Sequence, residues 1–127
     1  MPFFVYVKIP LDGGQAERMP ALHEGLERVL AAQALGELIG WGGSLSAPPG
    51  GPGGAAVSHH RLDIEVIDQG RALAVLQDAL AGFAAPDGTE LHYTEAGRAM
   101  QRVYAGARWA AATPSTATSR HARGPGR

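Results

Sequence analysis

The chain has 127 residues, of which 45% are hydrophobic, and it contains no cysteine. This length suits one domain with a real core, and the missing thiols exclude disulfides, zinc–thiolate sites, iron–sulfur clusters and cysteine nucleophiles. Because no apolar run approaches the roughly 20 residues of a membrane helix and the N-terminus lacks a basic signal region, we expect a cytoplasmic protein with no membrane partner.

Charge is divided unevenly along the chain. Residues 1–97 hold all 12 acidic side chains and five of the 11 basic ones, whereas residues 98–127 hold six arginines and no acid. Such asymmetry bears on binding partners rather than on the fold. We therefore distinguish an acidic body, residues 1–97, from a basic C-terminal segment, residues 98–127.

The first half of the chain alternates strand and helix patterns. Residues 3–9 are rich in β-branched and aromatic side chains and end at Pro10, which predicts a strand. Residues 20–35 carry leucines at helical spacing, which predicts a helix. Residues 37–45 predict a second strand, loosened by its glycines, and residues 46–58 predict a long flexible loop.

The second half begins with the same pattern. Residues 59–67 alternate polar and apolar side chains and predict a strand, and residues 68–83 predict a helix capped by an aspartate. Residues 89–94 predict a fourth strand. Residues 95–111 are rich in alanine and arginine and predict a further helix. Residues 113–127 have the composition of a disordered tail.

The order strand–helix–strand–strand–helix–strand predicts a ferredoxin-like α+β plait. In this βαββαβ fold two helices cover one face of a four-stranded antiparallel sheet. We expect it over residues 1–97, with a basic C-terminal helix or disordered tail over residues 98–127. Residues 36–43 and 86–93 resemble segments of small uncharacterised bacterial ferredoxin-like proteins, without indicating a named family. The fold itself selects no function.

One face of the predicted sheet stays open. Strand alternation places on it the side chains of Phe4, Tyr6, Lys8, Arg61, Asp63, Glu65, Glu90 and His92. Aromatic side chains on such a face stack RNA bases in some plaits, but central carboxylates and an acidic body oppose phosphate. We therefore expect the body not to bind nucleic acid, and the open face to be solvated or covered by a partner or by the C-terminal segment.

Side chains suited to catalysis or metal binding are few. His59 and His60 are adjacent and so point to opposite faces of a strand, and His23 is expected to be solvated on a helix. Glu90 and His92 could act as an acid–base pair, but they also fit ordinary strand polarity. Since no recognisable hydrolase or metalloprotease motif is present, we expect no catalytic residue, no metal site and no cofactor.

An acidic domain with surface aromatics is suited to binding a basic protein, because opposite potentials speed the encounter and aromatic anchors supply affinity. Trp41 lies between two glycines, which fits either a contact anchor or a core anchor beneath the first helix. We predict a non-catalytic protein-binding module, such as an immunity protein or antitoxin that neutralises a basic toxin. Its predicted partner-binding residues are Tyr6, Glu37, Trp41, Asp63, Glu65, Glu90 and His92.

Two alternatives stay open at this point. The first is a small-ligand binder or a dimeric plait enzyme, with a cleft near Tyr6, Glu90 and His92. The second is a nucleic-acid-binding protein that uses its basic C-terminal segment, although six dispersed arginines are a weak electrostatic signal.

Overall fold

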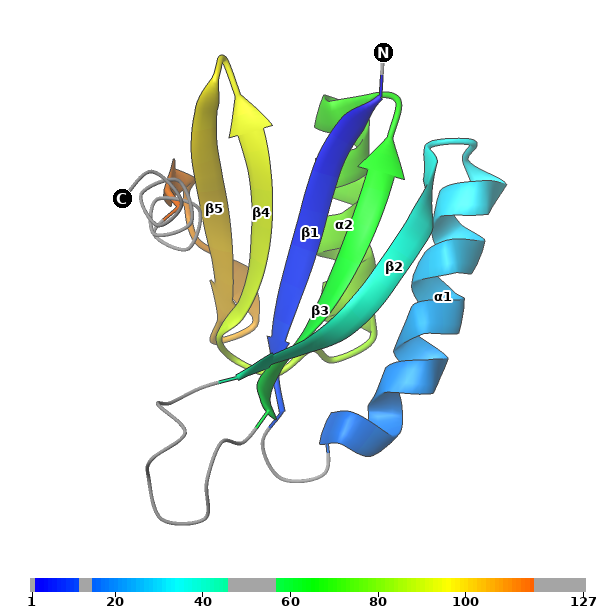
Figure 1. Cartoon of the computed structure of the whole chain (residues 1–127), viewed down its shortest axis with the longest axis vertical. Coiled ribbons are helices and arrows are strands. Elements are labelled where there is room, and N and C mark those ends of the chain that lie inside the picture. Colours follow the sequence, from blue (N-terminus) through cyan, green and yellow to red (C-terminus); the bar gives the residue numbers. More distant parts are fainter. Residues whose placement is uncertain (1, 12–14, 46–56, 116–127) are drawn as a thin grey trace.

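A seven-stranded antiparallel sheet with two α-helices on one face forms the protein (Figure 1). The structure is a computed structural model that describes residues 2–11, 15–45 and 57–115. Its elements in chain order are β1 (Phe3–Pro10), the 3-10 turn η1 (Gln15–Arg18), α1 (Met19–Ala32), β2 (Gly36–Leu45), β3 (Val57–Val66), α2 (Gln69–Gly82), β4 (Thr89–Glu95), β5 (Arg98–Ala105), β6 (Arg108–Trp109) and β7 (Thr113–Pro114). Most of the predicted loop over residues 46–58, and the tail from residue 116 onward, lie outside the described residues.

The four-stranded plait predicted from the sequence is wrong. Strands and helices through β4 follow one another in the predicted order, but the sheet does not end at β4. Its strand order is β2-β3-β1-β4-β5-β6, with β7 also paired to β5. The helix predicted over residues 95–111 is absent, because these residues form the end of β4, β5 and β6. The sheet therefore continues past β4 into residues 98–109.

Two tight turns allow this continuation of the sheet. Ala96 and Gly97 join β4 to β5 with φ angles of 52° and 78°, and Gly106 and Ala107 join β5 to β6 with φ angles of 61° and 64°. Two-residue loops with positive φ at both positions match the twist of antiparallel strands. The alanines are unusual in this conformation, which is why the sequence pattern did not indicate a hairpin.

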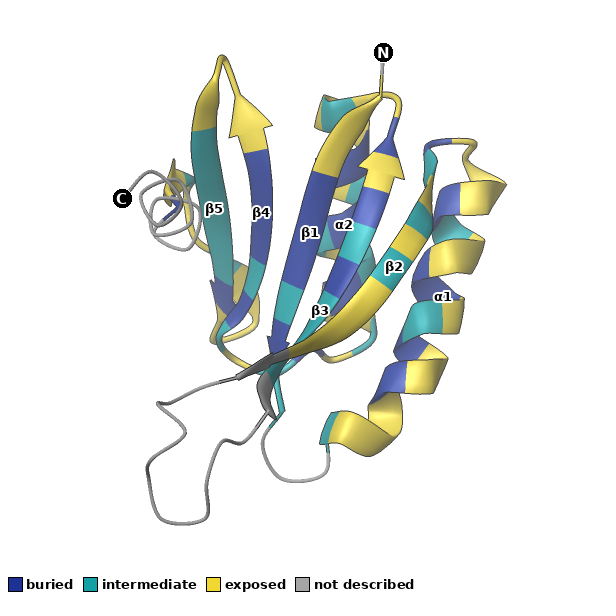
Figure 2. Cartoon of the chain, viewed as in Figure 1, coloured by how far each residue is buried: buried dark blue, intermediate teal, exposed yellow. Residues whose placement is uncertain are grey.

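The core lies between the sheet and the helices (Figure 2). Its fully buried side chains come from five elements: Val5, Val7, Ile9, Leu26, Leu30, Leu62, Ile64, Val66, Leu76, Leu80 and Leu91. The helices approach each other where Gly25 of α1 faces the ring of Phe83, which occupies the space that a Cβ at Gly25 would need. Within the described ranges, neither helix has the length and hydropathy needed to cross a membrane.

Candidate functional site

The structure separates the seven predicted partner-binding residues into two groups. The exposed group lies on β2 and β3 near one edge of the sheet and consists of Glu37, Trp41 and Glu65. The other group lies in the middle of the open face, which is the sheet face opposite the helices, and makes contacts within the protein. It consists of Tyr6, Asp63, Glu90 and His92.

The centre of the open face is a stack of three planar side chains from three strands. The guanidinium of Arg61 on β3 lies 3.8 Å from the centre of the Tyr6 ring on β1, within the range of a cation–π interaction. Tyr6 stacks on His92 of β4, with ring centres 4.4 Å apart and planes 6° apart. Because Tyr6 is only 8% exposed and His92 only 1%, a partner or ligand cannot reach these two rings in this conformation.

Polar side chains hold both ends of this stack. Arg61 Nε donates to Asp63 Oδ1 at 2.7 Å. The ring nitrogens of His92 are 2.7 Å from Glu90 Oε1 and 2.8 Å from Ser115 Oγ. The hydrogen bond from His92 lowers the pKa of Glu90 below its usual value. The stack therefore ties the segment after β7 to the middle of the sheet.

Ser115, His92 and Glu90 are also the residue types of a hydrolase triad. Ser115 and His92 are each only 1% exposed, whereas a nucleophile must be reached by its substrate. The arrangement supports a structural role, and the cleft predicted near Tyr6, Glu90 and His92 is filled by these side chains themselves. Sequence reasoning missed Ser115, because it lies in a segment whose composition resembled a disordered tail.

The edge of the sheet at β2 is open. Among the residues that the structure describes, β2 pairs with β3 alone, and it is exposed along much of its length (Figure 2). A bulge between Leu38 and Gly40 leaves Ile39 without a register partner. Ile39 and Trp41 are 49% and 66% exposed. A long edge strand with exposed apolar side chains is a template for pairing with another chain.

Two carboxylates lie side by side at this edge. Glu37 of β2 is directly opposite Glu65 of β3, a placement of like charges that destabilises a sheet. The ion pairs found among the described residues involve other acids. Both glutamates line a cavity of about 290 Å³ together with Pro2, Ala34 and Ile67. A cavity with two carboxylates and apolar walls fits the long stem and charged head of a basic side chain.

A pair of histidines joins α1 to β3 beside the exposed Trp41. The Nε2 atoms of His23 and His60 are 2.6 Å apart, and the edge of the Trp41 ring approaches His23 with ring centres 5.2 Å apart. Burial lowers the pKa of both histidines, and His23 lowers that of His60 further. The solvated His23 predicted from the sequence is thus wrong, because the imidazole turns toward the sheet.

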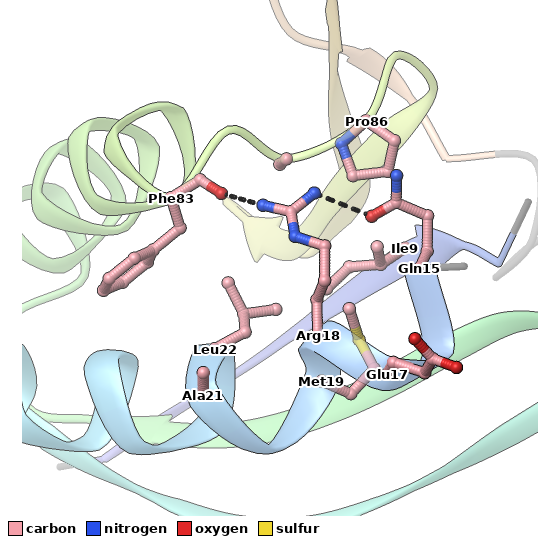
Figure 3. A pocket seen from close by; sticks show the side chains of 10 residues that line it. Ile9, Gln15, Glu17, Arg18, Met19, Ala21, Leu22, Phe83 and Pro86 are labelled. Carbon is pink, nitrogen blue, oxygen red and sulfur yellow. Dashed lines mark hydrogen bonds between the residues drawn. The ribbon is translucent and has the colours of Figure 1, made fainter. Parts of the chain in front are cut away.

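A separate cavity of about 370 Å³ lies between the start of α1 and the end of α2 (Figure 3). Its apolar lining includes Ile9, Met19, Leu22 and Phe83. Arg18 lies at this cavity and donates to the backbone carbonyls of Phe83 and Ala84 and to the side chain of Gln15. Since a cation at these carbonyls caps α2, we assign Arg18 a structural role.

The basic C-terminal segment is divided between the sheet and the residues beyond it. Arg98 and Arg102 belong to β5 and Arg108 to β6. Arg102 is engaged within the fold, where it donates to the Tyr93 hydroxyl at 3.1 Å and to Gln77 Oε1 at 2.6 Å. The other three arginines lie outside the described residues, so the nucleic-acid alternative stays a prediction.

Comparison with known proteins finds no matching family model, curated protein or solved structure. The resemblance of residues 36–43 and 86–93 to bacterial proteins therefore stays a prediction.

Proposed function

We propose that the protein is a non-catalytic binding module that docks a basic protein on its open sheet edge. The docking surface flanks the β2 edge: Phe4, Glu37 and Glu65 lie on the open face of the sheet, Trp41 lies on the face toward α1, and Ile39 lies in the bulge. The observation that carries the proposal is the combination, at the β2 edge of the sheet, of exposed apolar side chains with two adjacent carboxylates, Glu37 of β2 and Glu65 of β3, that no cation neutralises among the described residues.

The chemistry of this edge suits the addition of a strand from a partner. A strand laid along β2 would form main-chain hydrogen bonds, and its alternate side chains would contact the docking surface. A lysine or arginine of that strand would enter the cavity beside Glu37 and Glu65. Trp41 would supply an aromatic anchor of the kind that dominates binding energy at interfaces.

The more specific proposal is an immunity protein or antitoxin in the cytoplasm. A toxin that acts on nucleic acid needs a basic cleft for phosphates, and carboxylates can occupy such a cleft in their place. Glu37 and Glu65 are the carboxylates available for this, because Asp63 and Glu90 are already bonded to Arg61 and His92.

The test compares the protein with variants of its docking surface. Wild type, Trp41→Ala and the double variant Glu37→Lys/Glu65→Lys are used to capture partners from cells of the source organism. Glu17→Lys is the control, since Glu17 is an exposed acid on η1 and is not part of the docking surface. We expect one protein with a basic surface to bind wild type and Glu17→Lys. It should bind neither Trp41→Ala nor Glu37→Lys/Glu65→Lys. The purified pair should bind at least tenfold more weakly at 300 mM than at 50 mM salt.

Two results would contradict the proposal. One is that no protein is retained by wild type in preference to the Glu37→Lys/Glu65→Lys variant. The other is that the captured protein binds every variant equally, with an affinity indifferent to salt, because binding would then use another surface.

A further inference from the structure

We propose that His23 and His60 form a binding site for a divalent transition-metal ion, with Cu²⁺ bound most tightly. The site joins α1 to β3, and the inference does not rest on the proposed docking of a partner protein. It rests on two imidazole nitrogens from different elements that already face each other, with their Nε2 atoms 2.6 Å apart.

The spacing of the two nitrogens is nearer to that of square-planar than to that of tetrahedral coordination. With metal–nitrogen bonds of about 2.0–2.1 Å, two adjacent ligands are about 2.9 Å apart in a square-planar complex and about 3.3 Å apart in a tetrahedral one. The imidazoles must therefore separate by about 0.3 Å for the first geometry and about 0.7 Å for the second. Square-planar or tetragonal coordination by nitrogen is typical of Cu²⁺ and Ni²⁺, and Cu²⁺ forms the stronger complexes.

A metal ion can bind the two histidines if the hydrogen between their Nε2 atoms moves to another ring nitrogen. Imidazole coordinates a metal ion in its neutral form. Without a metal, one ring carries its hydrogen on Nε2 and donates it to the other Nε2. A shift of this hydrogen to Nδ1 leaves a lone pair on each Nε2, so binding requires no net loss of a proton from the pair, and both rings must turn from the N···N line for the two lone pairs to reach one ion.

Two side chains near the histidine pair bear on metal binding: Glu27 supplies negative charge, and Trp41 supplies a fluorescent probe. The carboxylate of Glu27, one helical turn after His23, interacts electrostatically with its imidazole, which favours a cation. No three His, Cys, Asp or Glu side chains of the described residues form a metal-binding group, so water would complete the coordination. The Trp41 ring touches His23, and Cu²⁺ held there would quench its fluorescence.

Titration of the tag-free protein with Cu²⁺ tests the site. We expect one equivalent to quench Trp41, and the electron paramagnetic resonance spectrum to show coupling to two nitrogens. His23→Gln and His60→Gln should each bind Cu²⁺ at least tenfold more weakly by calorimetry. Trp41→Phe should lose the quenching but keep the binding.

His59→Gln is the matched control, because His59 neighbours His60 on the strand but points to the opposite face. It should bind Cu²⁺ as wild type does. The proposal is overturned if millimolar Cu²⁺ does not quench Trp41, or if His59→Gln weakens binding as much as His60→Gln. Binding by His23→Gln and His60→Gln within twofold of wild type would also overturn it. If those variants unfold, the electron paramagnetic resonance spectrum of wild type with Cu²⁺ is the test. Coupling to fewer than two nitrogens would refute the site.

Discussion

Replacement of Gly36 by alanine should destabilise the protein, whereas the same replacement six residues later should not. Gly36 begins β2 opposite Val66. A Cβ at this position would collide with the carbonyl oxygen of Glu65 and lie 2.9 Å from the Val66 Cα. These are backbone atoms of β3, so they cannot rotate away. A Cβ at Gly42, in the same strand, would meet no atom within 4 Å.

The expected free-energy changes differ in sign. Forcing an extra carbon into a packed site costs about 1–3 kcal/mol, and a clash with backbone places Gly36→Ala in the upper part of this range. Gly42→Ala has no such cost and reduces the entropy of the unfolded chain, which is worth about 0.5–1 kcal/mol. Both variants should stay folded, because a domain of this size has a stability of about 5–15 kcal/mol.

Urea unfolding followed by circular dichroism measures both variants. With a slope of about 1–3 kcal/mol per molar urea, the midpoint of Gly36→Ala should fall by roughly 1 M while that of Gly42→Ala stays level or rises. Equal midpoints for the two variants would refute the close approach of β2 to β3. If Gly36→Ala also lowers partner affinity, the position of β2 matters to the docking surface.

Three further results are expected. Leu76→Ala removes a fully buried core side chain and should cost about 2–5 kcal/mol in urea unfolding; a loss below 1 kcal/mol would contradict its burial. Asp68→Ala removes the helix cap that accepts a hydrogen bond from the Arg71 backbone N–H and should lower the free energy of unfolding by about 0.5–2 kcal/mol; an unchanged free energy of unfolding would contradict the role of this cap. The hydrogen bond from His92 lowers the pKa of Glu90 below its usual 4.5. The ionised Glu90 should therefore stabilise the folded protein fully above this pH, and the stabilisation should be lost as the pH falls through the pKa of Glu90 in the folded state. Unfolding at pH 3 to 7 should show a shallower decline for Glu90→Gln, and an unchanged slope would disprove the linkage.

Local patterns in the sequence predicted the elements through β4 correctly. Alternation of Leu62, Ile64 and Val66 indicated a strand with one buried face, and the spacing of Leu73, Leu76 and Leu80 indicated a helix; all are buried as expected. Such patterns work because each element must bury one face wherever it is placed. The pattern failed at residues 95–111, where helix propensity favoured a helix and the Ala96–Gly97 turn formed a hairpin instead.

The candidate sites depended more strongly on tertiary structure. The sequence indicated that Tyr6, Asp63 and His92 share a face, but could not show that Arg61 and Ser115 close this group to a partner. It also placed His60 among apolar residues without indicating that His23 faces it from α1. The only relevant signal was a histidine on an otherwise apolar strand face.

The sequence by itself determined the acidic character of the body and the kind of secondary structure over most of the chain, because charge and hydrophobic periodicity are read within a few neighbouring residues. Only the tertiary structure decided that the sheet extends past β4, that β2 is its edge strand among the described residues, and which polar side chains meet. Each of these depends on the pairing of strands and packing of helices far apart in the chain. Contacts of this kind are chosen by the total burial and hydrogen bonding of the fold, and no short segment encodes them.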